Sequence, residues 1–429
     1  MTSFHQLSRW TPLSQMDVFK VPPTQCSIDK DQETDYRPIQ SVTAGNPIQF
    51  DFSSAEDEYV NLFETYFHTQ VKFTLIKDDG TAITSADWDY VLPANNLLHS
   101  MFSQIDIKIN NQDITRQSST YAYRAYLETL LGFSNSAKKS HLQNVGWYDD
   151  KKQRLELIKS STNTSIIDLR GKLHLDLTYQ ERAILGRTMF SIRMVPHQPK
   201  FYLTVPDGIN VTVELIDPRL DVHRSKITEQ QLKGHQAALA VGTAKYPICR
   251  TEVIPFNLTK DYVDFMQDNL ISGQIPRRCF VMFVSNDAFN GSLKEEPFQF
   301  ENYNISYICM YVDGTMYPSR PYSPNFDKNL FAREHTALYQ VLNQNGTDTY
   351  LQLSKKEFKT TNTIFAFNFA PDLSSGPGAA GHVNLIKRGS VRIHVKFNEP
   401  LRKAVKCLLF AEFDNMIEID EMRNVMTDY

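Results

Sequence analysis

Apolar residues recur at every second position over most of this chain, and this alternation constrains its fold more than any other feature. In the stretch SQIDIKINN, Ile105, Ile107 and Ile109 face one way, and Asp106 and Lys108 face the other. The same period appears in IQFDFS (48–53), HTQVKFTLI (68–76), TMFSIRMV (188–195), KFYLTV (200–205), INVTVELI (209–216), RCFVMFV (278–284), NISYICMYV (304–312), TIFAFNFA (363–370), SVRIHVKF (390–397) and CLLFAEF (407–413). Because this is the pattern of a strand with one buried face, strands are predicted to dominate the chain.

Two stretches have helical spacing instead. TYAYRAYLETLLGF ends at Gly132, which predicts a helix stop. NFDKNLFAREHTALYQVLNQNG offers Asp327 as an N-cap and Asn345-Gly346 as the stop. The apolar stripes are Tyr123, Tyr126, Leu127 and Leu130 in the first stretch, and Phe331, Leu338 and Leu342 in the second. Each predicted helix is short and follows a predicted strand.

The order of these elements repeats along the chain. The echoes are PIQFDFSS with VIPFNLTK (Ile48 and Ile254), QIDIKINNQDIT with NISYICMYVDGT (Ile105 and Ile305), and GINVTVELIDP with GSVRIHVKFNEP (Gly208 and Gly389). Each echo is weak by itself, but the three occur in the same order. Together they predict a duplicated unit of about 200 residues, within the usual range of domain sizes.

A unit of that length, with many short strands and turn-rich joints, fits a β-sandwich and most plausibly a jelly roll. The chain of 429 residues also exceeds the roughly 250–300 at which single cores stop growing. The predicted fold class is all-β with a few short helices: two tandem jelly rolls, a double jelly roll. The predicted bounds are 1–44 for an N-terminal arm, 45–220 for the first jelly roll, 221–247 for a polar linker, 248–415 for the second jelly roll and 416–429 for a C-terminal tail.

Charge and cysteine content argue against several classes of protein. The formal charge of −4 gives the chain no overall attraction to nucleic acid. The cysteines, which are Cys26, Cys249, Cys279, Cys309 and Cys407, are far apart and include no C-x-x-C pair, so neither a disulfide framework nor a zinc knuckle is indicated. The N-terminus lacks the pattern of a secretory signal, and no apolar run approaches the roughly 18 residues that span a bilayer. We expect a protein that is neither secreted nor membrane-spanning.

The stretch GPGAAG is the most enzyme-like in the chain, because Gly376, Gly378 and Gly381 satisfy the dinucleotide-binding pattern. That pattern must open a helix, however, and strand alternation follows it here. His382 and Val383 stand where a P-loop has Lys and Ser or Thr. We interpret the glycines as an inter-strand loop of the second jelly roll, and no cofactor is predicted.

Other signatures of catalysis are absent from the sequence. It contains no G-x-S-x-G or H-E-x-x-H motif, and its histidines are scattered without metal-ligand spacing. Acidic clusters such as 56–58 are interpreted as solvated faces. No catalytic or metal-binding residue is predicted, and the chain is not expected to be an enzyme.

A basic segment, residues 387–406, leaves two interpretations open. Arg392 and Lys396 lie on the polar face of a predicted strand, Arg402 and Lys403 follow it, and Glu399 is the single acid of the segment. An ordinary solvated face, paired with acids elsewhere, explains this pattern. A surface for an anionic partner, either nucleic acid or a neighbouring subunit, explains it as well.

Several stretches resemble the double jelly-roll major capsid proteins of Polinton (Maverick) elements, the related adintoviruses and, more distantly, virophages. They are LPANNLLHSMFSQIDIKINNQDIT with YAYRAYLETLLGF, VELIDPRLDVHRSKI, and the segment 362–420. The resemblance covers most of 45–425. Within it, SSGPGAAGHVNLIKRGS is similar to the P-S-G…N-x-S loop of large DNA virus capsid proteins, although Ile386 stands where such loops often have Ser.

This resemblance implies a structural protein that forms a homotrimeric, pseudo-hexameric capsomer (hexon) and assembles into an icosahedral shell around viral or transposon DNA. It implies contacts with itself, with neighbouring capsomers, and with penton and minor capsid proteins. Any contact with packaged double-stranded DNA is indirect, and no small-molecule substrate is expected. The arm and the tail EMRNVMTDY are expected to latch neighbouring capsomers or to contact inner components. The implied location is the virion capsid, assembled inside the host cell.

A duplicated jelly-roll binding protein, lectin-like or cupin-like and without shell assembly, is the alternative. A cupin is expected to cluster His and carboxylate ligands on one strand pair, and this sequence shows no such cluster. A lectin is usually secreted, and this sequence predicts no signal peptide.

Overall fold

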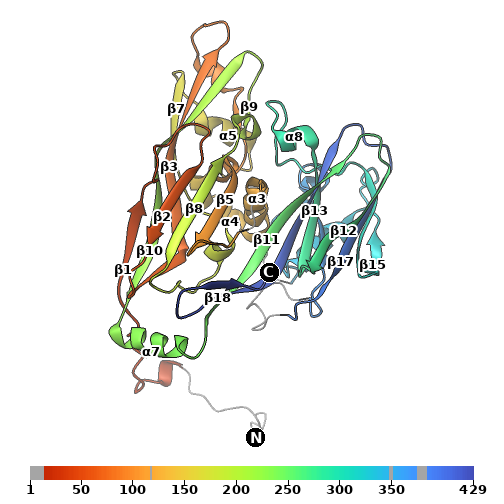
Figure 1. Ribbon diagram of the computed structural model, residues 1–429. Helices are drawn as coiled ribbons and strands as arrows, with labels where there is room; N and C mark the ends of the chain where they lie inside the picture. Colours follow the sequence, from red (N-terminus) through yellow and green to blue (C-terminus); the bar gives the residue numbers. More distant parts are fainter. Residues whose placement is uncertain (1–13, 116–117, 347–350, 374–383) are drawn as a thin grey trace.

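Two β-sandwiches lie side by side in the computed structural model, which describes residues 14–115, 118–346, 351–373 and 384–429 (Figure 1). We call them roll 1 and roll 2. The sheets of roll 1 have the order β1 (Ile28–Tyr36), β10 (Ile209–Ile227), β3 (Glu58–Lys77), β7 (Thr164–Lys172) and the order β2 (Ile48–Ser53), β8 (Met189–Pro196), β5 (Phe102–Ile109), β6 (Gln112–Asp113). Those of roll 2 are β11 (Ala244–Leu258), β18 (Val405–Ile419), β13 (Arg278–Ser285), β16 (Phe365–Asn368), with β19 (Val425–Thr427) beside β18, and β12 (Asp264–Gln274), β17 (Arg388–Phe397), β14 (Ile305–Val312), β15 (Thr315–Tyr322).

The two rolls have the same topology. Counting in chain order the eight strands that form the two four-stranded sheets of each roll, with β19 set aside, the first, eighth, third and sixth form one sheet, and the second, seventh, fourth and fifth form the other. This order is that of an eight-stranded jelly roll. The predicted fold class, a double jelly roll with a few short helices, is therefore confirmed.

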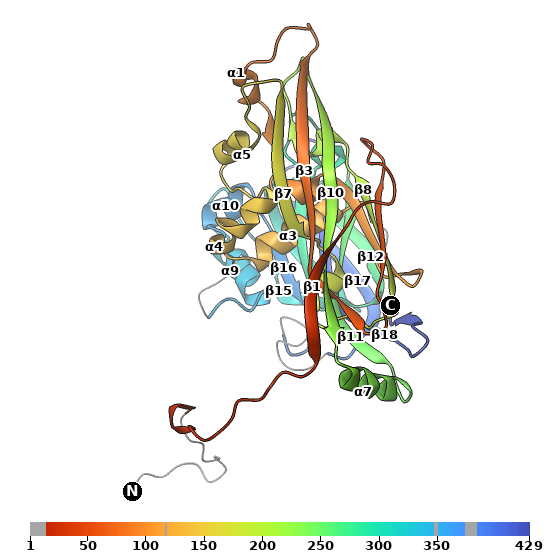
Figure 2. The same cartoon turned by 90° about the vertical axis from the view of Figure 1, so that its left-hand side faces the viewer.

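Short helices lie in the connections between the strands. They are η1 (Ser14–Met16), α1 (Ser85–Trp88), α2 (Leu97–Ser100), α3 (Tyr121–Gly132), α4 (Asn135–Lys138), η2 (His141–Val145), α5 (Lys151–Ile158), η3 (Asp176–Tyr179), α6 (Pro199–Tyr202), α7 (Glu229–Leu239), α8 (Asn286–Asn290), α9 (Ala332–Val341) and α10 (Lys355–Thr360). The strands β4 (Leu92–Pro93) and β9 (Leu203–Thr204) form a small separate pair. From the side, helices of both rolls lie along the same flank of the molecule (Figure 2).

Burial explains which strands alternate in sequence and which do not. In β3, Val71, Phe73 and Leu75 are buried, while the residues between them are more exposed. In β13, every residue from Cys279 to Val284 is buried, because both faces of this strand are covered. An unbroken apolar run is typical of such a strand.

Three segments differ from their sequence interpretation. β10 continues to Ile227 and α7 follows it, so the predicted linker 221–247 begins as a strand paired with both β1 and β3. The arm 1–44 contains β1, and the tail 416–429 contains the end of β18 and β19. Backbone pairing with strands distant in sequence forms these elements. β1 is largely polar and carries no alternation that could reveal it, whereas Ile417 and Ile419 do alternate at the end of β18.

Two of the three sequence echoes match strands that are not equivalent. Ile105 and Ile305 lie on β5 and β14, which occupy the same place in their rolls. Ile48, however, lies on β2 and Ile254 on β11, whereas the equivalent of β2 is β12. The third echo matches β10 with β17, the equivalent of β8. Strands with one buried face resemble one another whatever their position, so this error has a simple cause.

Local predictions were confirmed for one helix and corrected for the other. α3 ends at Gly132 as predicted. The second helix, α9, begins after Phe331 and not at Asp327, because Asn325 and Leu330 pair to form a turn between them. It ends before the predicted stop, at a left-handed Asn343. The stretch 200–205 was also wrong as a continuous strand: Pro199 starts α6 there, and β9 takes only Leu203–Thr204.

Candidate assembly surfaces

The helix α3 lies between the two rolls and presents aromatic rings to roll 2. The Tyr126 ring stacks on Phe298 with 4.3 Å between centroids, and the Tyr123 ring stacks on Phe289 at 5.4 Å. Both phenylalanines belong to the connection between β13 and β14. Because aromatic pairs add to the free energy of burial, this stack is one of the contacts that hold roll 1 against roll 2.

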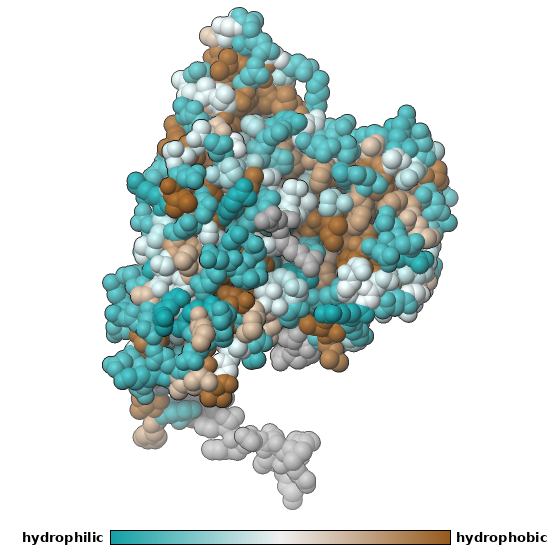
Figure 3. All heavy atoms as spheres, in the orientation of Figure 1, coloured by the Kyte–Doolittle hydropathy of each residue, from teal (hydrophilic) through white to brown (hydrophobic). Residues whose placement is uncertain are grey.

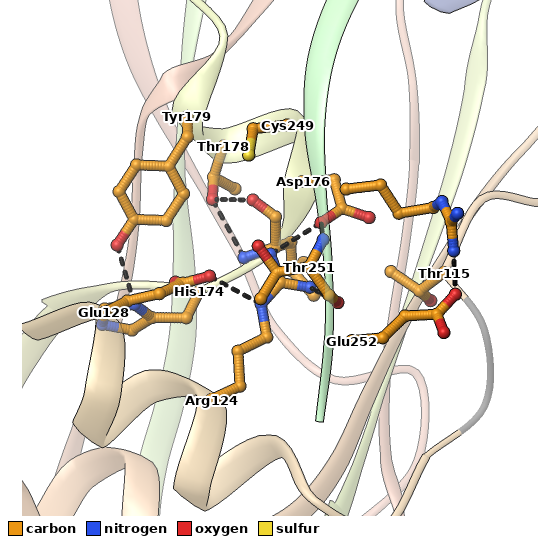
Figure 4. Close-up of polar contacts among 12 residues, drawn as sticks. Thr115, Arg124, Glu128, His174, Asp176, Thr178, Tyr179, Cys249, Thr251 and Glu252 are labelled. Atoms are coloured by element: carbon orange, nitrogen blue, oxygen red, sulfur yellow. Dashed lines mark hydrogen bonds and ion pairs between the residues drawn. The ribbon is translucent and has the colours of Figure 1, made fainter. Parts of the chain in front are cut away.

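The second contact is a buried polar network around Arg124 (Figure 4). The guanidinium of Arg124 lies 2.7 Å from Asp176 Oδ1 and 2.8 Å from Glu128 Oε1. Asp176 in turn accepts the backbone N–H of Thr251 on β11, at 3.1 Å. A further bond between the rolls runs from the hydroxyl of Thr120 to the carbonyl of Val253, at 3.0 Å. Roll 1 thus binds the edge strand of roll 2 through charged and backbone groups together.

Opposing effects set the pKa values of the two acids in this network. Burial would raise the pKa of Glu128, but Arg124 and His174 outweigh it and hold that pKa below its usual value. For Asp176, burial dominates and raises the pKa even though Arg124 lowers it. Both carboxyl groups depend on Arg124 for their charge balance.

A pocket of about 260 Å³ adjoins this network, and a histidine with a carboxylate beside it is a common general-base arrangement. His174 Nδ1 lies 2.7 Å from both Glu128 Oε2 and the Tyr179 hydroxyl. Its Nε2 faces the Thr129 hydroxyl at 3.4 Å. Since both ring nitrogens already have protein partners within roll 1, the arrangement favours a structural role over proton transfer to a substrate.

Beside His174 lies a second buried histidine, His99, which makes the stability of roll 1 sensitive to pH. The two rings meet edge to face at 4.6 Å. The hydroxyl of Tyr121 accepts the backbone N–H of His174 and lies 3.0 Å from Nδ1 of His99, to which it can donate. Burial, together with the nearby His174, lowers the pKa of His99 well below its usual value. The folded protein therefore holds His99 neutral.

We expect the free energy of unfolding to fall as the pH drops below about 6.5, because His99 then binds a proton in the unfolded chain but stays neutral in the folded protein. Above that pH His99 is neutral in both states and its contribution is complete. The expected slope is up to about 1.4 kcal/mol per pH unit, and His99→Gln should remove it. Urea unfolding at pH 7, 6 and 5 measures the slope. His197, whose pKa burial lowers to about 4, acts in the same direction and remains in the variant.

The C-terminal segment 420–429 folds back on roll 1 of its own chain and does not extend toward a neighbour. Arg423 Nε donates to the carbonyl of Gly186 at 2.7 Å, and the carbonyl of Arg423 accepts from Asn110 at 2.7 Å. The hydroxyl of Tyr429 donates to the carbonyl of Ile114 at 2.8 Å. The segment is thus a clasp across the two rolls, and the expected role of the tail as a latch between capsomers gains no support from its placement.

Removing residues 420–429 should loosen the contact between the rolls. Three hydrogen bonds to roll 1 of about 1 kcal/mol each are lost, together with the pairing of β19 with β18, so we expect the free energy of unfolding to fall by at least roughly 2–4 kcal/mol. Amide hydrogen exchange should accelerate in the loops around Ile114 and Gly186. Arg423→Ala, which removes one side-chain bond, is the milder comparison. Unchanged exchange in both loops would contradict the role of this clasp.

The residues predicted as an assembly or anionic-partner surface each lie near an acid. On β17, Arg392 and Lys396 lie 2.5 Å from Asp268 and 3.2 Å from Asp264 of the neighbouring β12. In the turn that follows, Arg402 lies 3.3 Å from Glu399 and Lys403 lies 3.1 Å from Glu295. The structure does not gather the four into one basic patch, which favours the solvated face. Their role in assembly stays a prediction.

The remaining candidates offer little for chemistry. Gly376, Gly378 and Gly381 lie outside the described residues. Within the described chain, three or more His, Cys, Asp or Glu side chains nowhere gather in a cluster that could hold a metal ion. None of the described helices has the length and apolar character needed to span a membrane. Burial raises the pKa of the thiols of Cys249, Cys279 and Cys407, and such thiols are unreactive core residues.

Sequence reasoning missed the residues that join the rolls. Arg124 was the one available signal, as an arginine in an otherwise apolar helix with Glu128 four residues later. Asp176 and Thr251 carry no signal, because their positions relative to Arg124 arise only from the fold.

Comparison with known proteins gives one relative of similar length and a set of solved structures. No protein-family model matches the chain. A Caenorhabditis elegans protein described as uncharacterized is 25% identical over 431 residues, which cover 95% of this chain and 99% of that protein.

Several solved structures with this fold are viral proteins. A chain of the Sputnik virophage matches with a TM-score of 0.61 and 8% identity, covering 98% of this chain and 93% of the other. The mavirus major capsid protein matches with a TM-score of 0.54 and 11% identity over 100% and 96% of the two chains. The Faustovirus major capsid protein gives 0.57 and 9% over 93% and 91%. At identities this low, these structural matches establish the double jelly-roll fold along the whole chain and nothing further.

Proposed function

We propose that this chain is the major capsid protein of a virus or of a virus-like element integrated in a genome. One observation carries the proposal: two jelly rolls of identical strand order fill the chain, and the major capsid proteins of mavirus and Faustovirus share this fold over nearly their whole length. A non-catalytic role is consistent with the buried His174, whose ring nitrogens both have protein partners.

In this proposal three copies form a pseudo-hexameric capsomer, because two similar rolls per chain give six similar lobes around a threefold axis. The functional units are roll 1, from β1 to β10, and roll 2, from β11 to β18, which extend beyond the predicted bounds 45–220 and 248–415. A closed ring repeats one heterologous contact between copies. The full-length relative in an animal, together with the sequence resemblance to Polinton and adintovirus proteins, favours an integrated element. Penton and minor capsid proteins would be its partners, DNA contact would be indirect, and the assembled protein would lie in the virion capsid.

The test is the mass and shape of the purified chain in solution. Three chains of 49.4 kDa weigh about 148 kDa, which light scattering distinguishes from one chain. Negative-stain images should show hexagonal particles or shells. A chain that stays monomeric at all concentrations and salt conditions, with no particles, would overturn the proposal.

A further inference from the structure

In the contact between roll 1 and roll 2, a helix of roll 1 faces the first strand of roll 2. Because the rolls have the same topology, the chain contains a second helix and a second first strand in the equivalent places. In roll 1, α3 lies between the fifth and sixth strands and faces β11, the first strand of roll 2. The equivalent of α3 in roll 2 is α9, between β15 and β16, and the equivalent of β11 in roll 1 is β1. Among the described residues, α9 and β1 do not contact each other within one chain: β1 lies at the left end of the molecule and β15, which precedes α9, at the right end (Figure 1).

The strand β1 is an exposed acidic edge. Its one described strand partner is β10, so its other backbone edge carries no paired strand. Four acids, Asp29, Asp31, Glu33 and Asp35, alternate along it and are all exposed. With Lys30 as the single base, the strand has a formal charge of −3. Hydrophilic residues cover most of the surface around this lower left part of the molecule (Figure 3).

The face of roll 2 around α9 and α10 is basic. We define this α9–α10 face by its exposed cations, Arg320, Lys328, Arg333, Lys355 and Lys356. The two helices pack together through the rings of His335 and Phe358, 5.3 Å apart.

The exposed acids on the α9–α10 face, Asp327 and Glu357, reduce its positive charge but do not cancel it: five exposed cations less two exposed acids leave a formal charge of +3. Glu334 is buried and accepts the backbone N–H of Ser323. Leu330, which is 64% exposed and lies just before α9, adds an exposed apolar side chain to this face. The face is therefore complementary in charge to β1.

We propose that the α9–α10 face of one copy binds the β1 edge of a second copy, repeating between chains the contact that α3 makes with β11 within the chain. The proposal rests on the proposed function and names the surfaces through which copies join. Charge complementarity selects this pairing over a contact between two β1 edges, which would place acids against acids. A contact between different surfaces of identical chains continues from copy to copy until the ring closes.

The test exchanges the charges. An edge variant carries Asp29→Lys and Asp35→Lys, and a face variant carries Lys355→Glu and Lys356→Glu. Each should raise the dissociation constant of the oligomer at least about tenfold at low salt, where surface charges are least screened. The variant with all four substitutions restores opposite charges and should recover most of the wild-type affinity. Lys152→Glu with Lys294→Glu, exposed lysines outside both surfaces, is the matched control and should assemble normally.

Sedimentation velocity at several protein concentrations gives the readout, and circular dichroism melting shows that each variant remains folded. If the wild type is oligomeric and the edge and face variants assemble normally, this pairing is overturned while the capsid proposal stands. The same holds if the variant with all four substitutions assembles more weakly than either double variant. A wild type that is monomeric throughout overturns both. If β1 instead binds a different class of protein, the edge variant should self-assemble as the wild type does, and that result also counts against the pairing.

Discussion

Replacing Arg124 by methionine is expected to lower the free energy of unfolding by about 3–5 kcal/mol, the usual cost of leaving buried charges without a partner. The substitution keeps the apolar stem and removes the cation that serves both Asp176 and Glu128. Because Asp176 also accepts the N–H of Thr251 on β11, the loss falls on the contact between the rolls. Urea unfolding, followed by far-UV circular dichroism, which reports on the strands of both rolls, should change from one transition to two as the rolls uncouple.

The matched control for this substitution is Arg392→Met, which breaks an exposed pair with Asp268. Exposed ion pairs contribute about 0–1 kcal/mol, so this variant should unfold almost as the wild type does. Equal effects of the two substitutions would show that the network around Arg124 adds no more than a surface pair. The claim that it joins the rolls would then fail.

Glu412→Gln is expected to destabilise roll 2 by a similar amount, about 3–5 kcal/mol. Glu412 on β18 lies 2.7 Å from Arg277 and 2.6 Å from Arg278, all in the buried part of the sheet. Burial would raise the pKa of Glu412, but the two guanidinium groups hold it below its usual value. The neutral amide keeps the shape and leaves two buried cations to share Asp414 and polar neighbours.

The lowered pKa of Glu412 also fixes the direction of a pH effect. The group contributes stability above the carboxyl pKa of the unfolded chain, about 4.5, and this contribution is lost as the pH falls further. The difference in unfolding free energy between Glu412→Gln and wild type should therefore shrink in acid. Glu399→Gln, in an exposed pair with Arg402, is the control and should change stability little at any pH. A constant difference between Glu412→Gln and wild type across the acid range would contradict this origin of the effect.

Sequence alternation, the repeated order of elements and the family resemblance together predicted the double jelly roll but not all of its strands. β2, β8 and β17 each have one buried and one more exposed face, so their side chains alternate and their bounds were close to those observed. Nearly every residue of β1 is exposed, so this strand has no apolar face from which its sequence could predict it. Only its pairing with β10, nearly 200 residues later in the chain, makes it a strand.

The candidate surfaces were harder to predict than the fold for the same reason. The sequence shows the cations of β17, but not that Asp264 and Asp268 of β12 lie beside them. It shows Arg124 and Glu128 four residues apart, but not Asp176, 52 residues away, or Thr251, 127 residues away. Contacts at such separations depend on strand register and on the docking of one roll on the other, and a local pattern encodes neither.

The strand order of each roll has a consequence for the way the chain folds. β10 is the last strand of roll 1, yet it lies between β1 and β3, and β18 holds the same place between β11 and β13. During synthesis the first and third strands of each roll must therefore wait, with open edges, for a strand made much later. Contacts of such long sequence separation slow folding. Each roll should consequently acquire its structure in one late step, and chains cut within a roll should aggregate before they form half a sandwich.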